Sequence, residues 1–265
     1  MPTLAPTPRS QTVPHMDALN LLDGEIRRIA ELAADTDMGT EIPGCPGWDL
    51  AGLLDHVARV HLRNARMVRE LATERVDLRT VNPGRPADWS EVPAWFLRIG
   101  AELLAALRAA DPDAPMFAWG KDKHVRFWIR RMLNETTIHR MDAEAAAGVE
   151  SRIEPAVAVD VIDELLDLLP YAEYFRPEVR ELHGDGETIH LHATDLDGTG
   201  LPGEWLITLE PHGFRWSRAH VKGAVAVRGS VRDLVQFVYG RRQQSELEVY
   251  GDLSLLAHWS AHSSL

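Results

Sequence analysis

The feature that most constrains this chain is a proline-free stretch, His124 to Val149, in which ionisable residues interrupt an apolar helical face. Its alanines and arginines favour a helix, and Gly148 marks a stop. At about 100° per residue, one face carries Trp128, Met132, Glu135, His139, Asp142 and Ala146. Glu135 and His139 are one turn apart, so they can reach one object together. A buried carboxylate needs a partner, and a metal ion, an arginine or a solvent-filled cleft would each serve.

A metal site here requires a third ligand, for which His56 is the candidate. Asp49 predicts the N-cap of the helix that holds it. One face of that helix carries Leu53, His56, Val60 and Met67. Two histidines and one glutamate form a known catalytic zinc set, which leaves a coordination position open. Spacing alone also allows a simpler interpretation, in which His56 is a hydrogen-bonded core histidine.

Several short motifs follow one another in a particular order and spacing. The first part of the chain has Cys45-Pro46-Gly47-Trp48, His56 and Glu135-x-x-x-His139-Arg140-x-Asp142. The last part has Val227-Arg228-Gly229, Leu234 to Arg241 and Val249-Tyr250-Gly251-Asp252. Together these motifs resemble the mycothiol-dependent maleylpyruvate isomerase family, which belongs to the wider DinB-like group of metal-binding four-helix bundles. The resemblance covers nearly the whole chain after its first dozen or so residues.

The resemblance implies a cofactor set and several site residues. The family metal is zinc, one per chain, and its ligands match His56, Glu135 and His139. The family thiol is mycothiol. A catalytic arginine of the second domain matches Arg241, although Arg228 is an alternative. Without the resemblance, Arg241 would only be a cation placed at a helix C-terminus, where it is favoured electrostatically.

The implied activity is a zinc-dependent addition of the mycothiol thiol to an electrophilic small molecule, of the maleylpyruvate cis–trans isomerase type. A cation stabilises the thiolate, which is the nucleophilic form. A mycothiol S-transferase that conjugates electrophiles is a close alternative. A non-catalytic metal-binding or regulatory module is an alternative of another class.

Charge and cysteine content limit the partners and the compartment. The net charge of −12 argues against a general nucleic-acid binder or an anionic-membrane binder. A single cysteine, Cys45, excludes an internal disulfide and fits a reducing cytoplasm. The resemblance implies mycothiol and a small electrophile or carboxylate substrate as partners, and we expect a monomer or weak dimer.

The apolar periodicity predicts four bundle helices and then a mixed domain. Helices are expected at 15–34, 50–73, 90–110, 124–149 and 156–169, followed by strands at 188–194, 205–209, 213–218, 224–227 and 247–250. Two short helices, 230–238 and 253–259, complete the pattern. The resemblance implies a DinB-like four-helix bundle followed by a small sterol-carrier-like α+β domain with its helices on one side of the sheet. Its parts are a disordered tail (1–14), a bundle (15–150), a connecting helix or linker (151–180) and the α+β domain (181–265).

Several polar residues near these motifs allow more than one role. Asp142 is one turn past His139, so it would either orient that ligand or pair with an arginine. We interpret Cys45 as a buried structural cysteine, and Arg130, Arg131 and Arg140 each as part of a solvated helix face. His190 and His192 alternate on one strand face, as in a two-histidine metal site. No neighbour in the sequence completes such a site, so an exposed strand face is expected.

Overall fold

The computed structural model describes residue 13 and residues 15–264. It divides the chain into two compact units, Val13–Arg152 and Ile153–Leu265. The tail expected at 1–14 lies outside the described residues except for Val13. Among the helices described, none has the length and apolar character needed to cross a bilayer.

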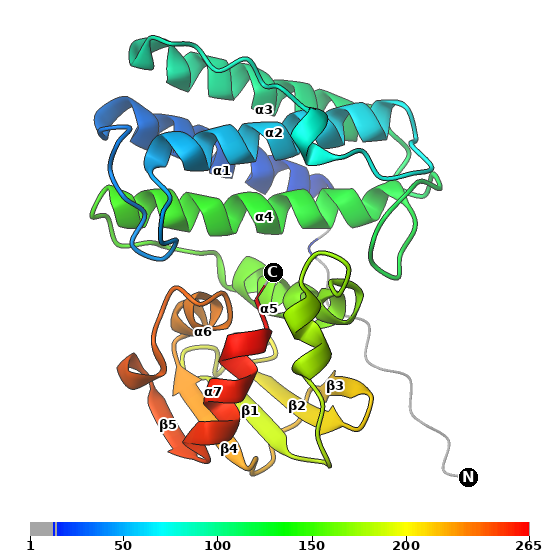
Figure 1. The fold of residues 1–265 in the computed structure, drawn as a ribbon, viewed down its shortest axis with the longest axis vertical. Coiled ribbons are helices and arrows are strands. Elements are labelled where there is room, and N and C mark those ends of the chain that lie inside the picture. The colour runs from blue at the N-terminus through cyan, green and yellow to red at the C-terminus, as the bar shows by residue number, and fades with distance from the viewer. Residues whose placement is uncertain (1–12, 14, 265) are drawn as a thin grey trace. The chain divides into compact units, whose positions relative to one another are not determined.

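The first unit is a bundle of four long helices (Figure 1). They are α1 (His15–Asp35), α2 (Leu50–Arg69), α3 (Val92–Ala109) and α4 (Val125–Ala146). Each helix packs against two others, in the cycle α1–α3–α2–α4. The apolar stripe of α1 is buried as expected, at Leu19, Leu22, Ile26, Ile29 and Ala33. Two short 3₁₀ turns, η1 (Leu78–Thr80) and η2 (Trp89–Glu91), lie between α2 and α3.

Helix α2 ends four residues before the expected position. Leu71 has a φ of 44°, which is the left-handed conformation of a helix C-cap. The backbone N–H groups of Leu71 and Ala72 donate to the carbonyls of Val68 and Met67, at 3.2 and 2.9 Å. This is the Schellman arrangement, built here without the glycine that normally marks it in a sequence.

The second unit begins with α5 (Pro155–Leu168) and two 3₁₀ turns, η3 (Leu169–Tyr171) and η4 (Pro177–Glu181). Its five strands are β1 (Thr188–Ala193), β2 (Glu204–Glu210), β3 (Gly213–Ser217), β4 (Val225–Gly229) and β5 (Glu248–Gly251). The strand order is β3-β2-β1-β4-β5. Strand β1 is antiparallel to β2 and parallel to β4. Helix α6 (Val231–Val238), turn η5 (Gln244–Glu246) and helix α7 (Leu253–His262) complete the unit.

The helices of this unit lie on one face of its sheet, which was the expected arrangement. Trp205 of β2 donates to Asp163 of α5 at 2.7 Å. Phe214 of β3 packs edge-on against Trp259 of α7, with ring centroids 5.1 Å apart. Helix α6 packs against α5 and β4. Side chains alternate between the two faces along a strand, so His190 and His192 of β1 lie on the opposite face.

Candidate metal centre

Two facing helices of the bundle, α2 and α4, position the three candidate ligands. The Asp49 carboxylate accepts a hydrogen bond from the Gly52 amide at 2.7 Å, which fixes the start of α2. His56 follows two turns into that helix. Glu135 and His139 lie one turn apart on α4, and its N-terminal end is set by the bridge between Pro115 and His124. These three side chains are neither fully buried nor fully exposed.

The donor atoms of the three side chains converge. The Nε2 atoms of His56 and His139 each lie 3.4 Å from Oε1 of Glu135. The two imidazole centroids are 5.0 Å apart. One donor atom from each residue falls within 4.8 Å of the other two. The structure therefore brings together the three residues that the sequence singled out.

These contacts are long for hydrogen bonds, and their spacing also suits a metal ion. A normal N–H···O bond is about 2.7–3.2 Å long. Around a tetrahedral zinc ion with bonds of about 2.0–2.1 Å, neighbouring ligand atoms are roughly 3.3 Å apart. The two separations of 3.4 Å match the second value. Two imidazole nitrogens and one carboxylate oxygen are also a ligand set that zinc accepts.

A second layer of contacts orients the candidate ligands. Oδ2 of Asp142 lies 3.0 Å from Nδ1 of His139, which leaves the Nε2 atom of that ring directed at Glu135. The thiol of Cys45 donates to the same carboxylate oxygen at 3.7 Å. The Trp48 ring packs edge-on against His56, with centroids 5.1 Å apart. Metal-binding histidines commonly donate their other nitrogen to a carboxylate in this way.

The Glu135 carboxylate is held in its ionised form. Burial alone would raise its pKa, but the Arg131 guanidinium and the hydrogen bonds from His139 and His56 outweigh that effect. Its pKa therefore lies well below the ordinary value. Arg131 pairs with Oε2 of Glu135 and leaves Oε1 to face the histidines.

The same carboxylates stabilise the charged form of His139. Burial lowers its pKa, yet the hydrogen bonds to Asp142 and Glu135 prevail and raise it to about 9. A ligand histidine must be neutral, so a cation at this position would displace that proton.

Five interpretations made from the sequence are wrong. Arg131 and Arg140 are not on solvated faces: both are buried, and Arg140 pairs with Glu25 of α1 and Glu144. Cys45 is half-buried rather than buried and contacts the second layer of the site.

The other two errors concern the β1 histidines. His190 is buried and not exposed. Residues distant in sequence do complete a cluster around His190 and His192, namely Glu204 and His220. No local sequence signal connects these positions, because their proximity depends on strand pairing.

The two candidate arginines belong to the second unit. Arg241 follows α6, after Gly240 with its φ of 72°, and donates to the Tyr239 carbonyl at 2.7 Å. Arg228, on β4, forms an ion pair with Glu248 at 3.3 Å. The catalytic role expected for Arg241 stays a prediction.

Comparisons with known proteins cover both units. The mycothiol maleylpyruvate isomerase N-terminal domain matches residues 19–144, and the MDMPI C-terminal domain matches residues 156–258. No curated protein is similar enough to match. A crystal structure of the mycothiol-dependent maleylpyruvate isomerase has a TM-score of 0.60 and 15% identity. A histidine-to-alanine variant of that enzyme has a TM-score of 0.63 and 15% identity.

Each alignment covers 91% of this chain and 95% of the other, so the two solved structures share the fold from end to end. The first family domain includes all three candidate ligands, and the second includes Arg228 and Arg241. The two domains occur here in order and fill most of the chain. This chain therefore belongs to the mycothiol maleylpyruvate isomerase family.

Proposed function

We propose that this protein is a zinc-dependent enzyme that activates the thiol of mycothiol for addition to an electrophilic small molecule. The observation that supports it most directly is the convergence of His56, Glu135 and His139, with donor atoms spaced as around a tetrahedral ion. Three protein ligands are the number typical of a catalytic zinc site, which keeps one position for water or substrate. The one cysteine fits a reducing compartment, and we extend the proposal to the cytoplasm.

The residues present have distinct roles in this proposal. Zinc bound by His56, Glu135 and His139 would stabilise a thiolate and so supply the nucleophile. Asp142 holds the His139 ring in the orientation that presents Nε2. Arg131 keeps Glu135 anionic and limits its rotation. Arg241 would bind a substrate carboxylate through its guanidinium.

The metal part of the proposal is tested by elemental analysis of protein purified without chelators. We expect zinc at the bundle site of the wild-type protein. Each of the three ligand variants should lose this zinc ion, because the two ligands that remain bind zinc weakly. These variants are His56→Ala, Glu135→Ala and His139→Ala. His212→Ala is the matched control, since this exposed histidine lies outside both metal-ligand groups. Unchanged zinc content in all three ligand variants would contradict the assignment.

The thiol part of the proposal is tested by a screen of electrophiles, including maleylpyruvate, with and without mycothiol. We expect turnover only when the thiol is present. Recovery of a trans isomer would indicate the isomerase reaction, whereas a stable conjugate would indicate an S-transferase. Cys45→Ser should remain active, because serine can still donate to Asp142. Loss of activity in a folded Cys45→Ser protein would show that the nucleophile belongs to the chain.

A further inference from the structure

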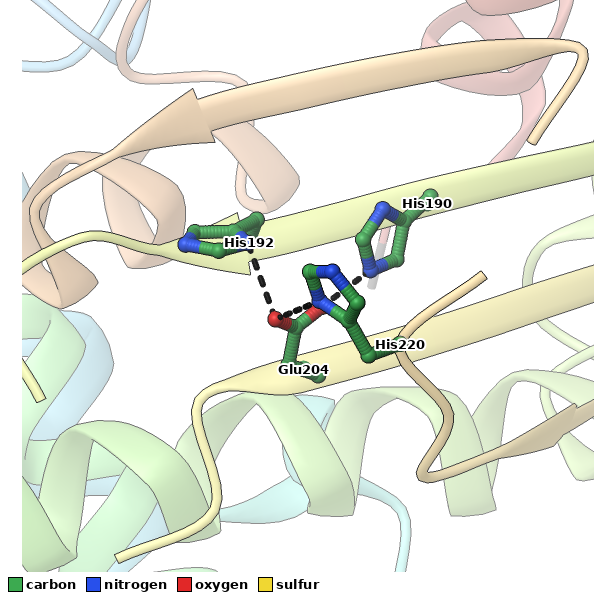
Figure 2. A group of neighbouring side chains, drawn as sticks. All are labelled: His190, His192, Glu204 and His220. Carbon is green, nitrogen blue, oxygen red and sulfur yellow. Dashed lines mark hydrogen bonds and ion pairs between the residues drawn. The ribbon is translucent and has the colours of Figure 1, made fainter. Parts of the chain in front are cut away.

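The face of the second unit's sheet opposite its helices carries a group of side chains that the proposed function does not use. It comprises His190 and His192 of β1, Glu204 of β2, and His220 from the segment between β3 and β4. Figure 2 shows the three imidazoles pointing at the Glu204 carboxylate from different directions. His190 and Glu204 are 14 positions apart in the sequence, and His220 lies 16 positions beyond Glu204. The fold, rather than local sequence, therefore assembles the group.

The sheet register explains the first three positions. His192 is the direct cross-strand partner of Glu204, and His190 pairs with Leu206 two residues along β2. Residues two apart on a strand share a face, so both histidines project beside the same carboxylate.

The fourth position depends on a close approach of the chain. A Cβ on Gly223 would lie 3.2 Å from Cβ of His190 and 2.7 Å from the Val225 carbonyl oxygen. The next residue, Ala224, donates its amide to Thr188 of β1 at 3.0 Å. Segment 218–224 therefore passes tightly over β1, and this path brings His220 to Glu204.

The donor atoms lie close together. Oε1 of Glu204 is 2.9 Å from Nδ1 of His192 and 2.6 Å from Nδ1 of His220. Nε2 of His190 contacts the other carboxylate oxygen. The three ring centroids form a nearly equilateral triangle, with sides of 6.1, 6.0 and 5.9 Å. One ligand atom from each of the four residues lies within 4.8 Å of the others.

From this geometry we propose that His190, His192, Glu204 and His220 bind a second zinc ion. Imidazole nitrogen with carboxylate oxygen is a donor set that zinc accepts, and four protein ligands are the number found in closed structural zinc sites. The bundle site has three candidate ligands and an open position, whereas this site is complete. The ion is therefore structural: it ties β1, the start of β2 and segment 218–224 together.

Small movements would admit the ion. Ligand atoms around tetrahedral zinc are roughly 3.3 Å apart, so the hydrogen-bonded contacts must open by less than about 1 Å. His220 can make this movement readily, because its side chain is 78% exposed and lies on a connecting segment. His190 is buried and fixed by its strand.

The test counts zinc equivalents in full-length protein that is stripped with a chelator, saturated with Zn²⁺ and desalted. Wild type should retain two equivalents, which is one more than the family resemblance implies. The sheet variant combines His192→Ala with His220→Ala, leaves only His190 and Glu204 of the proposed ligands, and should retain one. His139→Ala should also retain one, its addition to the sheet variant should leave none, and the control His212→Ala should retain two. His192 and His220 are chosen for substitution because neither side chain is buried, which makes a folding defect least expected.

A second measurement, which needs no activity assay, identifies where the second zinc ion binds. Zn²⁺ should raise the melting temperature of His139→Ala protein, because only the folded state has the ligands assembled. It should leave the melting temperature of the sheet variant that also carries His139→Ala unchanged. Equal zinc content and equal thermal shifts in His139→Ala protein and in this combined variant would overturn the second site.

The two zinc proposals fail separately in this design. If the bundle does not bind zinc, wild type retains one equivalent, His139→Ala also retains one, and the sheet variant retains none. If the sheet site does not bind zinc, wild type and the sheet variant both retain one, and His139→Ala retains none.

Discussion

His61 lies close to the candidate metal centre but belongs to the buried core. Its Nε2 atom is 2.9 Å from the Thr136 hydroxyl, which itself donates to the Met132 carbonyl at 2.7 Å. Thr136 therefore accepts from His61, which fixes the neutral tautomer with its proton on Nε2. The Nδ1 atom has no hydrogen-bond partner among the described residues. Burial of a charged ring in this environment lowers the His61 pKa to about 3.

Taken alone, the His61 shift destabilises the folded protein in acid. Between pH 6.5 and about 3, His61 binds a proton in the unfolded chain but not in the folded protein. The free energy of unfolding therefore falls as the pH falls. At pH 5 the loss is about 2 kcal/mol relative to pH 7.5. The stability that the neutral His61 ring contributes is fully present above pH 6.5.

His61→Gln removes this titration and keeps a donor for Thr136. We expect urea unfolding of metal-free protein to show a smaller loss of stability between pH 7.5 and 5 in this variant than in wild type. The exposed His212→Gln serves as the control and should keep the wild-type dependence. Equal pH dependence in wild type and His61→Gln would mean that His61 is charged in the folded protein.

The proximity of site residues could be predicted from the sequence where both residues lie on one helix. Glu135 and His139 are one turn apart on α4, so periodicity alone placed them together. The burial of Arg140 could not be inferred in this way, because its partner Glu25 is 115 residues away on another helix. Likewise, Glu204 and His220 join His190 only through strand pairing and a loop path.

At the scale of elements, helices α1 and α3 approach closely at Gly100. A Cβ added there would lie 2.5 Å from Cγ2 of the buried Ile26, too close for either helix to keep its position. Gly24 of α1 has open space around its Cβ direction and is exposed. The two helical glycines thus form a matched pair in which only the packing differs.

We expect opposite effects from alanine at these positions. Gly24→Ala should raise the free energy of unfolding by about 0.5–1 kcal/mol, through helix propensity. Gly100→Ala gains the same helix propensity, but overpacking against Ile26 costs about 1–3 kcal/mol, so the net effect should be destabilising. Urea denaturation of both variants provides the measurement. A stabilised Gly100→Ala protein would mean that α1 and α3 are free to separate at this point.

Element positions were largely predictable because amphipathic periodicity is a local property. The apolar stripe predicted α1, and alternation predicted β1. The end of α2 was missed because Leu71 adopts a conformation that usually requires glycine. Strand order was not predictable from these patterns, since the parallel pairing of β1 with β4 joins segments more than thirty residues apart.

At the scale of the whole molecule, the two units have separable contributions in the proposed function. The three bundle ligands all belong to Val13–Arg152, whereas Arg241 belongs to Ile153–Leu265. We expect full-length Arg241→Ala to keep its zinc and its mycothiol affinity but to lose turnover by orders of magnitude, because the acceptor is no longer positioned. Arg228→Ala is the matched control and should retain activity. Wild-type turnover in Arg241→Ala protein would exclude Arg241 as the catalytic arginine.

The same division predicts the behaviour of the isolated bundle, residues 13–152. Its helices bury their apolar stripes against one another, and its ligand set needs no residue from the second unit. We therefore expect it to fold cooperatively and to bind one zinc ion with the affinity of the bundle site in the full-length sheet variant. Calorimetric titration with Zn²⁺ and a turnover assay with mycothiol measure the two properties. Turnover should be orders of magnitude lower, because Arg241 is absent. Full activity in the isolated bundle would show that the second unit takes no part in catalysis, and that Arg241 has another role.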